Sequence, residues 1–93
     1  MGESSPKRER VVVHGHVQGI FFRDNVRRRA QQERLCGWVR NRPDGTLEAV
    51  FEGPPERIAR LAAFCEQGPP AARVDRVERF EEEPEGLSGF RVT

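Results

Sequence analysis

VVVHGHVQGIFFR, residues 11–23, is the stretch of sequence that decides the fold. It opens with a β-branched apolar run, which is typical of a buried strand. Gly15 and Gly19 bound the short loop that follows, and a helical pattern begins at Phe22. This succession favours binding of an oxyanion, because the first amides of a helix have no intrahelical acceptor and lie at the positive end of the helix dipole.

Arg23 lies in the first turn of the predicted helix, where a guanidinium group fits the edge of a phosphate or carboxylate. The same two glycines also fit an ordinary tight turn, and the pattern alone does not choose between these interpretations. A Walker loop is excluded because Ile20 follows Gly19, and a dinucleotide fingerprint is excluded because it needs three glycines. The loop residues that would surround an anion are Gly15, His16, Val17, Gln18, Gly19 and Ile20.

The 93 residues predict a disordered tail over residues 1–8 and one domain over residues 9–93. The net charge is +1, which indicates no strongly charged partner. The charge is unevenly distributed: residues 1–42 carry ten basic and four acidic side chains, and residues 43–93 carry six and eleven. A positive first half would attract small anions, although a solvated helix face is the favoured explanation for most of its arginines.

The cellular location is expected to be the cytoplasm. Residues 1–10 contain no apolar segment of the kind found in signal peptides, and no apolar run approaches the length of a membrane span. Cys36 and Cys65 fit no metal-binding spacing, so two free thiols in a reducing compartment are predicted, with a disulfide as the alternative. His14 and His16 flank Gly15 but lack a third ligand, so no metal site is predicted.

The order of predicted elements is strand, helix, strand, strand, helix, strand, with a small terminal strand. This order indicates an α+β fold, the ferredoxin-like α/β sandwich (βαββαβ), in which two helices cover one face of a mostly antiparallel sheet. Right-handed crossovers place the first and third strands side by side in the centre. The expected strands span residues 10–14, 37–41, 46–52, 76–82 and 89–93, and the register of the strand over 76–82 is left open. The first expected helix spans residues 22–34, and the second extends from Pro54–Pro55 to Gly68.

Glutamates mark two places where exposure to solvent is expected. In the strand over residues 46–52, Leu47, Ala49 and Phe51 share one face and predict a half-buried strand, with Glu48 and Glu52 on the other face. The acidic run over residues 81–85 is interpreted as a solvated turn.

Asn41 ends the second predicted strand, just before the turn at residues 42–45. An asparagine there fits a simple turn former, and its amide group also fits a water-positioning role. Beside it, the segments GHVQGIFFR (15–23), GWVRN (37–41) and DGTLEAVFEG (44–53) resemble acylphosphatases. The resemblance covers nearly all of residues 9–93.

The resemblance implies a ferredoxin-like enzyme that hydrolyses the carboxyl–phosphate bond of acyl phosphates without a metal or cofactor. It implies that loop amides between Gly15 and Ile20, together with Arg23, hold the phosphoryl group. It also implies that Asn41 positions the attacking water. The expected partner is therefore a small acyl phosphate, with broad specificity for the acyl group, and the expected state is a monomer.

Two other functions are compatible with this fold class. Ferredoxin-like sheets also bind single-stranded RNA, but the third predicted strand, TLEAVFE, carries glutamates and lacks the aromatic pattern such proteins use, so no nucleic-acid partner is expected. The remaining alternative is a non-catalytic module that binds phosphate or acyl phosphate. Retention of both Arg23 and Asn41 favours the enzyme.

Overall fold

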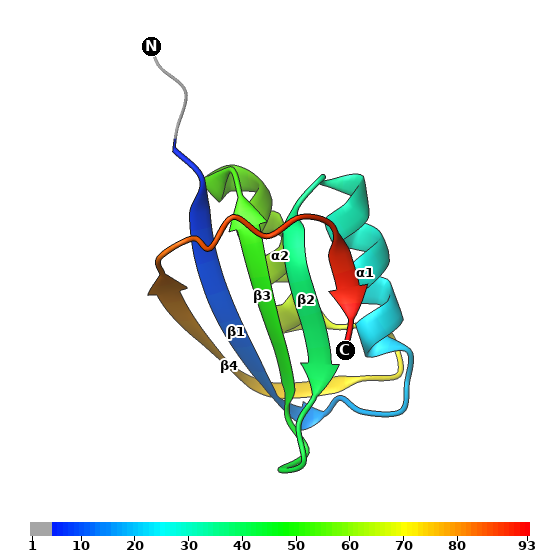
Figure 1. The fold of residues 1–93 in the computed structure, drawn as a ribbon. Coiled ribbons are helices and arrows are strands. Elements are labelled where there is room, and N and C mark those ends of the chain that lie inside the picture. The colour runs from blue at the N-terminus through cyan, green and yellow to red at the C-terminus, as the bar shows by residue number, and fades with distance from the viewer. Residues whose placement is uncertain (1–4) are drawn as a thin grey trace.

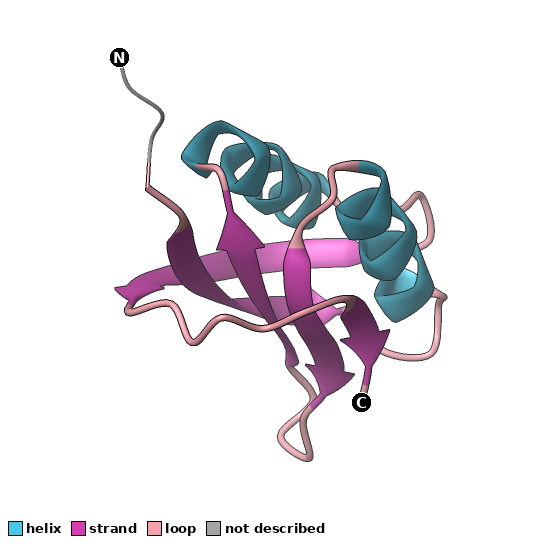
Figure 2. Ribbon diagram, turned by 45° about the horizontal axis from the view of Figure 1, so that its top comes forward, coloured by secondary structure: helices cyan, strands magenta, loops and turns pink. Residues whose placement is uncertain are grey.

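The computed structural model describes residues 5–93, in which two helices cover one face of a five-stranded sheet (Figures 1 and 2). This arrangement confirms the predicted fold class. The elements are β1 (Lys7–His16), α1 (Phe22–Gln32), β2 (Cys36–Asn41), β3 (Leu47–Gly53), α2 (Pro55–Gln67), β4 (Arg73–Glu82) and β5 (Phe90–Val92).

The strand order is β4-β1-β3-β2-β5, so the first and third strands lie side by side, as predicted. All neighbours are antiparallel except β2 and β5, which run parallel. The pairing of Arg8 with Glu82 and of His16 with Arg73 gives the β4 register, which the sequence left open. β4 also begins at Arg73, three residues before the predicted start of the strand.

Other element bounds also differ from the expectations, and β1 and α1 differ most: β1 ends at His16 rather than at residue 14. β1 begins at Lys7, so residues 7 and 8 of the predicted tail belong to the sheet, where Arg8 is buried. Residues 1–4 of that tail lie outside the described part of the chain. α1 ends at Gln32 rather than Arg34, because Arg34 adopts a left-handed conformation (φ 58°) and the Leu35 amide donates to the Ala30 carbonyl.

The core lies between the sheet and the helices. The apolar stripes predicted for both helices are buried as expected: Phe22, Val26 and Ala30 on α1, and Ile58, Leu61, Ala62 and Cys65 on α2. The sheet contributes the inward-facing residues of each strand, among them Val11, Val13, Val39, Leu47, Ala49, Phe51 and Phe90. Because side chains alternate along each strand, the remaining residues point to the other face of the sheet. That face has no helix over it.

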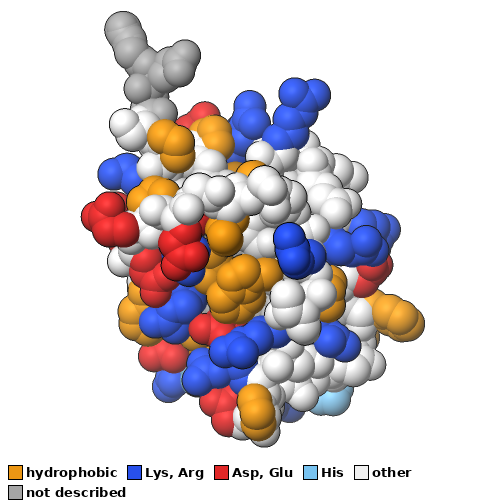
Figure 3. Space-filling model, viewed as in Figure 1, with side chains coloured by type: hydrophobic (Ala, Val, Ile, Leu, Met, Phe, Trp, Pro, Cys, Tyr) orange, Lys and Arg blue, Asp and Glu red, His pale blue; other side chains and the backbone are white. Residues whose placement is uncertain are grey.

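Buried glutamates on this open face correct the expectation of a half-buried third strand. Glu48 and Glu52 are only 6% and 5% exposed. β3 is the central strand, and arginines from its neighbours cover both carboxylates. Arg40 donates to Glu48 at 2.8 Å, and Arg8 donates to Glu52 at 2.9 Å. Basic and acidic side chains accordingly intermingle on this face (Figure 3).

The connection between β4 and β5, residues 83–89, crosses the open face of the sheet (Figure 1). We call it the crossing segment. The Glu52 carboxylate accepts hydrogen bonds from the backbone amides of Glu85, Gly86 and Leu87, at 2.8 to 3.1 Å. The acidic run at 81–85 is therefore only partly a solvated turn, because Glu82 also accepts from Arg8 and Arg10.

These contacts determine how the two carboxyl groups titrate. Burial by itself would raise the pKa of Glu52, but the three amides and Arg8 outweigh it and hold that pKa below its ordinary value of 4.5. Hydrogen bonds from Arg10 and Arg8 lower the pKa of Glu82 in the same way. Because both values are lower in the folded chain, the stabilisation is present above about pH 4.5 and is lost as the pH falls through the folded values.

We expect Glu52→Gln to lower the free energy of unfolding at pH 7 by about 2 kcal/mol, because the buried guanidinium group of Arg8 loses the most buried of its charged partners. The variant should also lose less stability than the wild type between pH 6 and pH 3. Urea unfolding at several pH values measures both effects. Glu83→Gln, an exposed change in the crossing segment, is the control and should stay within about 0.5 kcal/mol of wild type. Equal stability of the two variants would contradict the anchoring role of Glu52.

Candidate active site

Sheet topology brings the ends of β1 and β2 to one edge. Both strands pair antiparallel with β3, so they run in the same direction on its two sides. Leu47 lies opposite Val13 of β1 and opposite Asn41 of β2. The loop that follows β1 and the Asn41 side chain therefore lie at the same edge, where α1 also begins.

The first part of the predicted anion loop belongs to β1. Gly15 pairs with Val74 of β4, just after a register shift, and His16 pairs with Arg73. The φ of Gly15 is 134°, and a Cβ built there would lie 2.0 Å from the Arg73 carbonyl oxygen. The glycine is thus explained by close approach of two strands. His16 is exposed at the strand end.

Gln18 ties the loop to the β2–β3 hairpin. Its side-chain amide donates to the carbonyl oxygen of Arg42 at 2.8 Å and to that of Thr46 at 2.9 Å. These residues flank the turn directly after Asn41. Gln18 therefore fixes the distance between the loop and the strand end that carries Asn41.

The start of α1 leaves its first amides without a side-chain cap. Phe21, the N-cap residue, adopts a left-handed conformation with φ 62° and has no polar side-chain atom. A bulky residue rarely adopts that conformation, and such strain is concentrated at functional sites. The uncapped helix start, at the positive end of the helix dipole, fits an anion.

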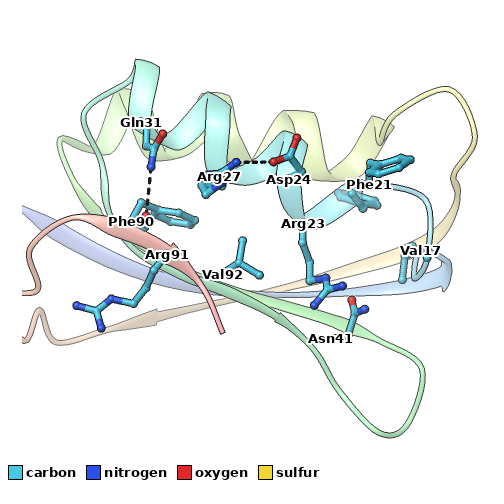
Figure 4. Close-up of a pocket in the computed structure, with 12 residues that line it drawn as sticks. Val17, Phe21, Arg23, Asp24, Arg27, Gln31, Asn41, Phe90, Arg91 and Val92 are labelled. Carbon is cyan, nitrogen blue, oxygen red and sulfur yellow. Dashed lines mark hydrogen bonds and ion pairs between the residues drawn. The ribbon is translucent and has the colours of Figure 1, made fainter.

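Arg23 and Asn41 line one pocket of about 700 Å³. Arg23 extends from the first turn of α1 toward Asn41 at the end of β2 (Figure 4). Among residues 5–93, no side chain forms a hydrogen bond or ion pair with the Arg23 guanidinium. The Asn41 Oδ1 atom is buried and accepts no hydrogen bond from the described residues. A cation and a buried acceptor thus face one cavity with their bonding capacity unused.

Comparison with known proteins agrees with this geometry. A family model described as acylphosphatase matches residues 9–92. An acylphosphatase of Thermococcus kodakarensis is 56% identical over 80 residues, which cover 86% of this chain and 88% of that protein. The chain belongs to the acylphosphatase family.

Solved acylphosphatase structures share the fold as well. The crystal structure of the Bacillus subtilis acylphosphatase superposes with a TM-score of 0.90 at 33% identity, covering 94% of this chain and 98% of that one. The Coxiella burnetii acylphosphatase gives the same TM-score at 40% identity, with 95% and 93% covered. These matches confirm the predicted family and its hydrolase class.

The pocket includes only part of the predicted residue set. Val17, Gly19, Arg23 and Asn41 line it, whereas Gly15, His16, Gln18 and Ile20 do not. Ile20 instead packs against the core.

Sequence reasoning missed the part of the pocket farthest from the loop. Arg27 and Gln31 line it from α1, and Phe90 and Val92 line it from β5. The helical residues were detectable, because Arg23, Arg27 and Gln31 recur at every fourth position and so share one helix face. The strand residues gave no local signal, since only the parallel β2–β5 pairing brings them beside α1.

The two histidines were expected to have no metal-binding role. His14 Nε2 lies 2.7 Å from Glu78 Oε1 and 3.2 Å from Arg76 Nη2, on β4. Within residues 5–93, the structure contains no group of three or more His, Cys, Asp or Glu residues placed to hold a metal ion. No helix in that same range is long and apolar enough to cross a membrane.

We expect Gln18→Met, which keeps the side-chain length but removes both donors, to loosen the hairpin. Loss of two hydrogen bonds should lower the free energy of unfolding by about 2 kcal/mol. It should also speed amide hydrogen exchange over residues 42–46. Gln31→Met is the matched control, since Gln31 makes one longer bond, 3.3 Å, to the Phe90 carbonyl. Unchanged exchange at residues 42–46 in the Gln18 variant would contradict the tether.

Proposed function

We propose that this chain hydrolyses acyl phosphates at the pocket between the loop, α1 and the end of β2. In this proposal, backbone amides of the loop and Arg23 hold the phosphoryl group, and Asn41 positions the attacking water. Membership of the acylphosphatase family supports the reaction class. The single observation that carries the site assignment is the presence of Arg23 and Asn41 in one pocket with unused bonding capacity.

The proposed reaction is an in-line displacement at phosphorus. The water oxygen, held by a hydrogen bond donated to Asn41 Oδ1, forms a bond to phosphorus. The bond from phosphorus to the acyl oxygen breaks, and its electron pair leaves with the carboxylate. The water proton passes to a phosphoryl oxygen, which gives inorganic phosphate. A carboxylate is a good leaving group, so the protein contributes mainly charge neutralisation and positioning.

The proton transfer to phosphate requires no general base from the protein. The structure is consistent with this step, because the ionisable residues that line the pocket are three arginines and Asp24. A hydrogen bond from Arg27 lowers the pKa of Asp24, so the carboxylate stays charged and already paired. A pH–rate profile that follows the ionisation of the substrate would support this step, and one that follows a protein side chain would contradict it.

We propose a cytoplasmic monomer that uses no metal or cofactor and binds no nucleic acid, with its functional domain extending from Lys7 to residue 93. Both cysteines are free, and burial raises the pKa of Cys65 to about 12, which suits an inert thiol in a reducing compartment. Sedimentation of the full chain measures the oligomeric state.

We expect Arg23→Lys to lower kcat/KM for benzoyl phosphate by about a hundredfold, because the lysine keeps the charge but loses the two-pronged donor. Arg23→Ala should lose still more, along with affinity for inorganic phosphate. Steady-state kinetics and phosphate titration measure these effects. Arg28→Ala, an exposed change on α1 that does not line the pocket, is the control. Activity in Arg23→Ala close to wild type would contradict the assignment.

We expect Asn41→Ala to retain phosphate binding and to lower kcat for benzoyl phosphate by about a hundredfold, because the water loses its acceptor. Assays with EDTA present test the proposed independence from metals. Retained turnover in the variant would contradict the water-positioning role. Phosphate binding without any hydrolysis by the wild type would instead identify the non-catalytic module.

A further inference from the structure

The backbone changes handedness where α1 begins. Phe21 is left-handed, with φ 62° and ψ 21°, whereas Phe22, the next residue, is already helical. Two successive residues of opposite handedness turn three consecutive backbone amides, here those of Phe21, Phe22 and Arg23, toward one point and so form a concavity that suits an anion. Among residues 5–93, none of these three amides donates a hydrogen bond. The direction of the amides therefore depends on the conformation of Phe21.

The conformation of Phe21 is unfavourable by itself. A left-handed backbone is strained for a residue with a bulky side chain, and burial of the ring does not offset this strain, because Phe21 is 80% exposed. Figure 4 shows the Phe21 ring directed away from the Arg23 and Asn41 side chains. A strained conformation of this kind persists only where the surrounding structure holds it.

Apolar packing holds the chain on both sides of Phe21. Ile20 packs against the core. Phe22 is buried, and its ring meets the Phe64 ring edge-on, with the two centroids 5.9 Å apart. These contacts fix the neighbouring side chains, but a rotation of the peptide group between Phe21 and Phe22 would leave both of them in place. A polar contact at the Phe21 carbonyl is needed to set the orientation of that peptide group.

Asn25 supplies that contact. The Phe21 carbonyl oxygen accepts the first helical hydrogen bond of α1 from the Asn25 backbone amide at 3.0 Å. It accepts a second hydrogen bond from the Asn25 side-chain Nδ2 at 2.9 Å. Rotation of the peptide group that follows Phe21 would break both bonds. Asn25 does not line the pocket, so its side chain acts on a bound anion only through Phe21.

The other end of the Asn25 side chain contacts an exposed arginine. Asn25 Oδ1 accepts a hydrogen bond from Arg28 Nη2 at 3.0 Å. The same guanidinium group also pairs with Asp24, and contacts of exposed arginines contribute little. Loss of the Arg28 side chain would leave the bond from Asn25 Nδ2 to Phe21 in place. The donor atom of Asn25 is therefore the part of this cluster on which Phe21 depends.

We propose that Asn25 is a positioning residue for the anion-binding amides at the start of α1. Its side chain holds the Phe21 carbonyl oxygen and thereby keeps Phe21 in the left-handed conformation that turns the three amides toward the phosphoryl group. This inference rests on the part of the proposed function that places the phosphoryl group at this helix start. Asn25 lies outside both sequence motifs, GHVQGIFFR and GWVRN.

Titration of Asn25→Ala with inorganic phosphate tests the inference. The Kd should rise roughly fivefold, as expected for the loss of one hydrogen bond, and kcat/KM for benzoyl phosphate should fall by a similar factor. Alanine favours a helix more than asparagine does, so unravelling of α1 would not explain the loss. Gln32→Ala, at an exposed position of α1 outside the pocket, is the matched control and should keep the wild-type Kd.

A second background tests the physical reason. Phe21→Gly allows the left-handed conformation without strain, so the Asn25 contact is needed less. In this background, Asn25→Ala should raise the Kd for phosphate roughly twofold or less. Each comparison is made within one background, so the effect of losing the Phe21 ring cancels. Thermal unfolding of every variant checks that the fold is retained.

The outcomes separate this inference from the proposed function. A rise in Kd for Asn25→Ala that is much smaller in the Phe21→Gly background would support the positioning role. An unchanged Kd, or an equal rise in both backgrounds, would overturn that role and leave the proposed function intact. A wild-type chain that binds phosphate but hydrolyses no benzoyl phosphate would overturn the proposed function alone, because the Kd still reports on Asn25. A wild-type chain that binds no phosphate would overturn both.

Discussion

The antiparallel pairing of β3 with both β1 and β2 is the constraint on which the rest of the structure depends. It forces β1 and β2 to run in the same direction, so their carboxyl ends meet one edge of the sheet. Near that edge, Leu47 of β3 pairs with Val13 of β1 on one side and with Asn41 of β2 on the other. Neighbouring strands lie about 4.8 Å apart, so this pairing holds Val13 of β1 and Asn41 about 10 Å from each other.

The two faces of the sheet are stabilised by different kinds of interaction. On one face, apolar side chains pack beneath both helices and form the core. On the other, buried carboxylates of β3 are paired with arginines, and Glu52 also binds the amides of the crossing segment. The crossing segment leads to β5, so the charged face also positions the strand that completes the pocket. Burial of these charges is tolerated because each carboxylate is hydrogen-bonded.

Unfavourable local features are concentrated at the pocket. Phe21 adopts a left-handed conformation, and Asn41 Oδ1 and Arg27 Nε are buried without partners. Each feature costs stability, since strain and unsatisfied polar groups are normally avoided in folded proteins. Their presence in one cavity is what a ligand-binding site requires, because a ligand offers the missing partners. The rigid sheet and the Gln18 tether are the parts of the fold that offset this cost.

The sequence by itself determined the fold class, the strand–loop–helix start, the apolar stripes of both helices and the family, because these depend on short-range periodicity and on motifs such as GHVQGIFFR and GWVRN. The tertiary structure alone showed that Gly15 serves strand packing, that Gln18 bridges to the hairpin, and that Glu52 is buried. It alone placed Val92 beside α1. These features depend on contacts between residues far apart in the chain, which no local pattern records.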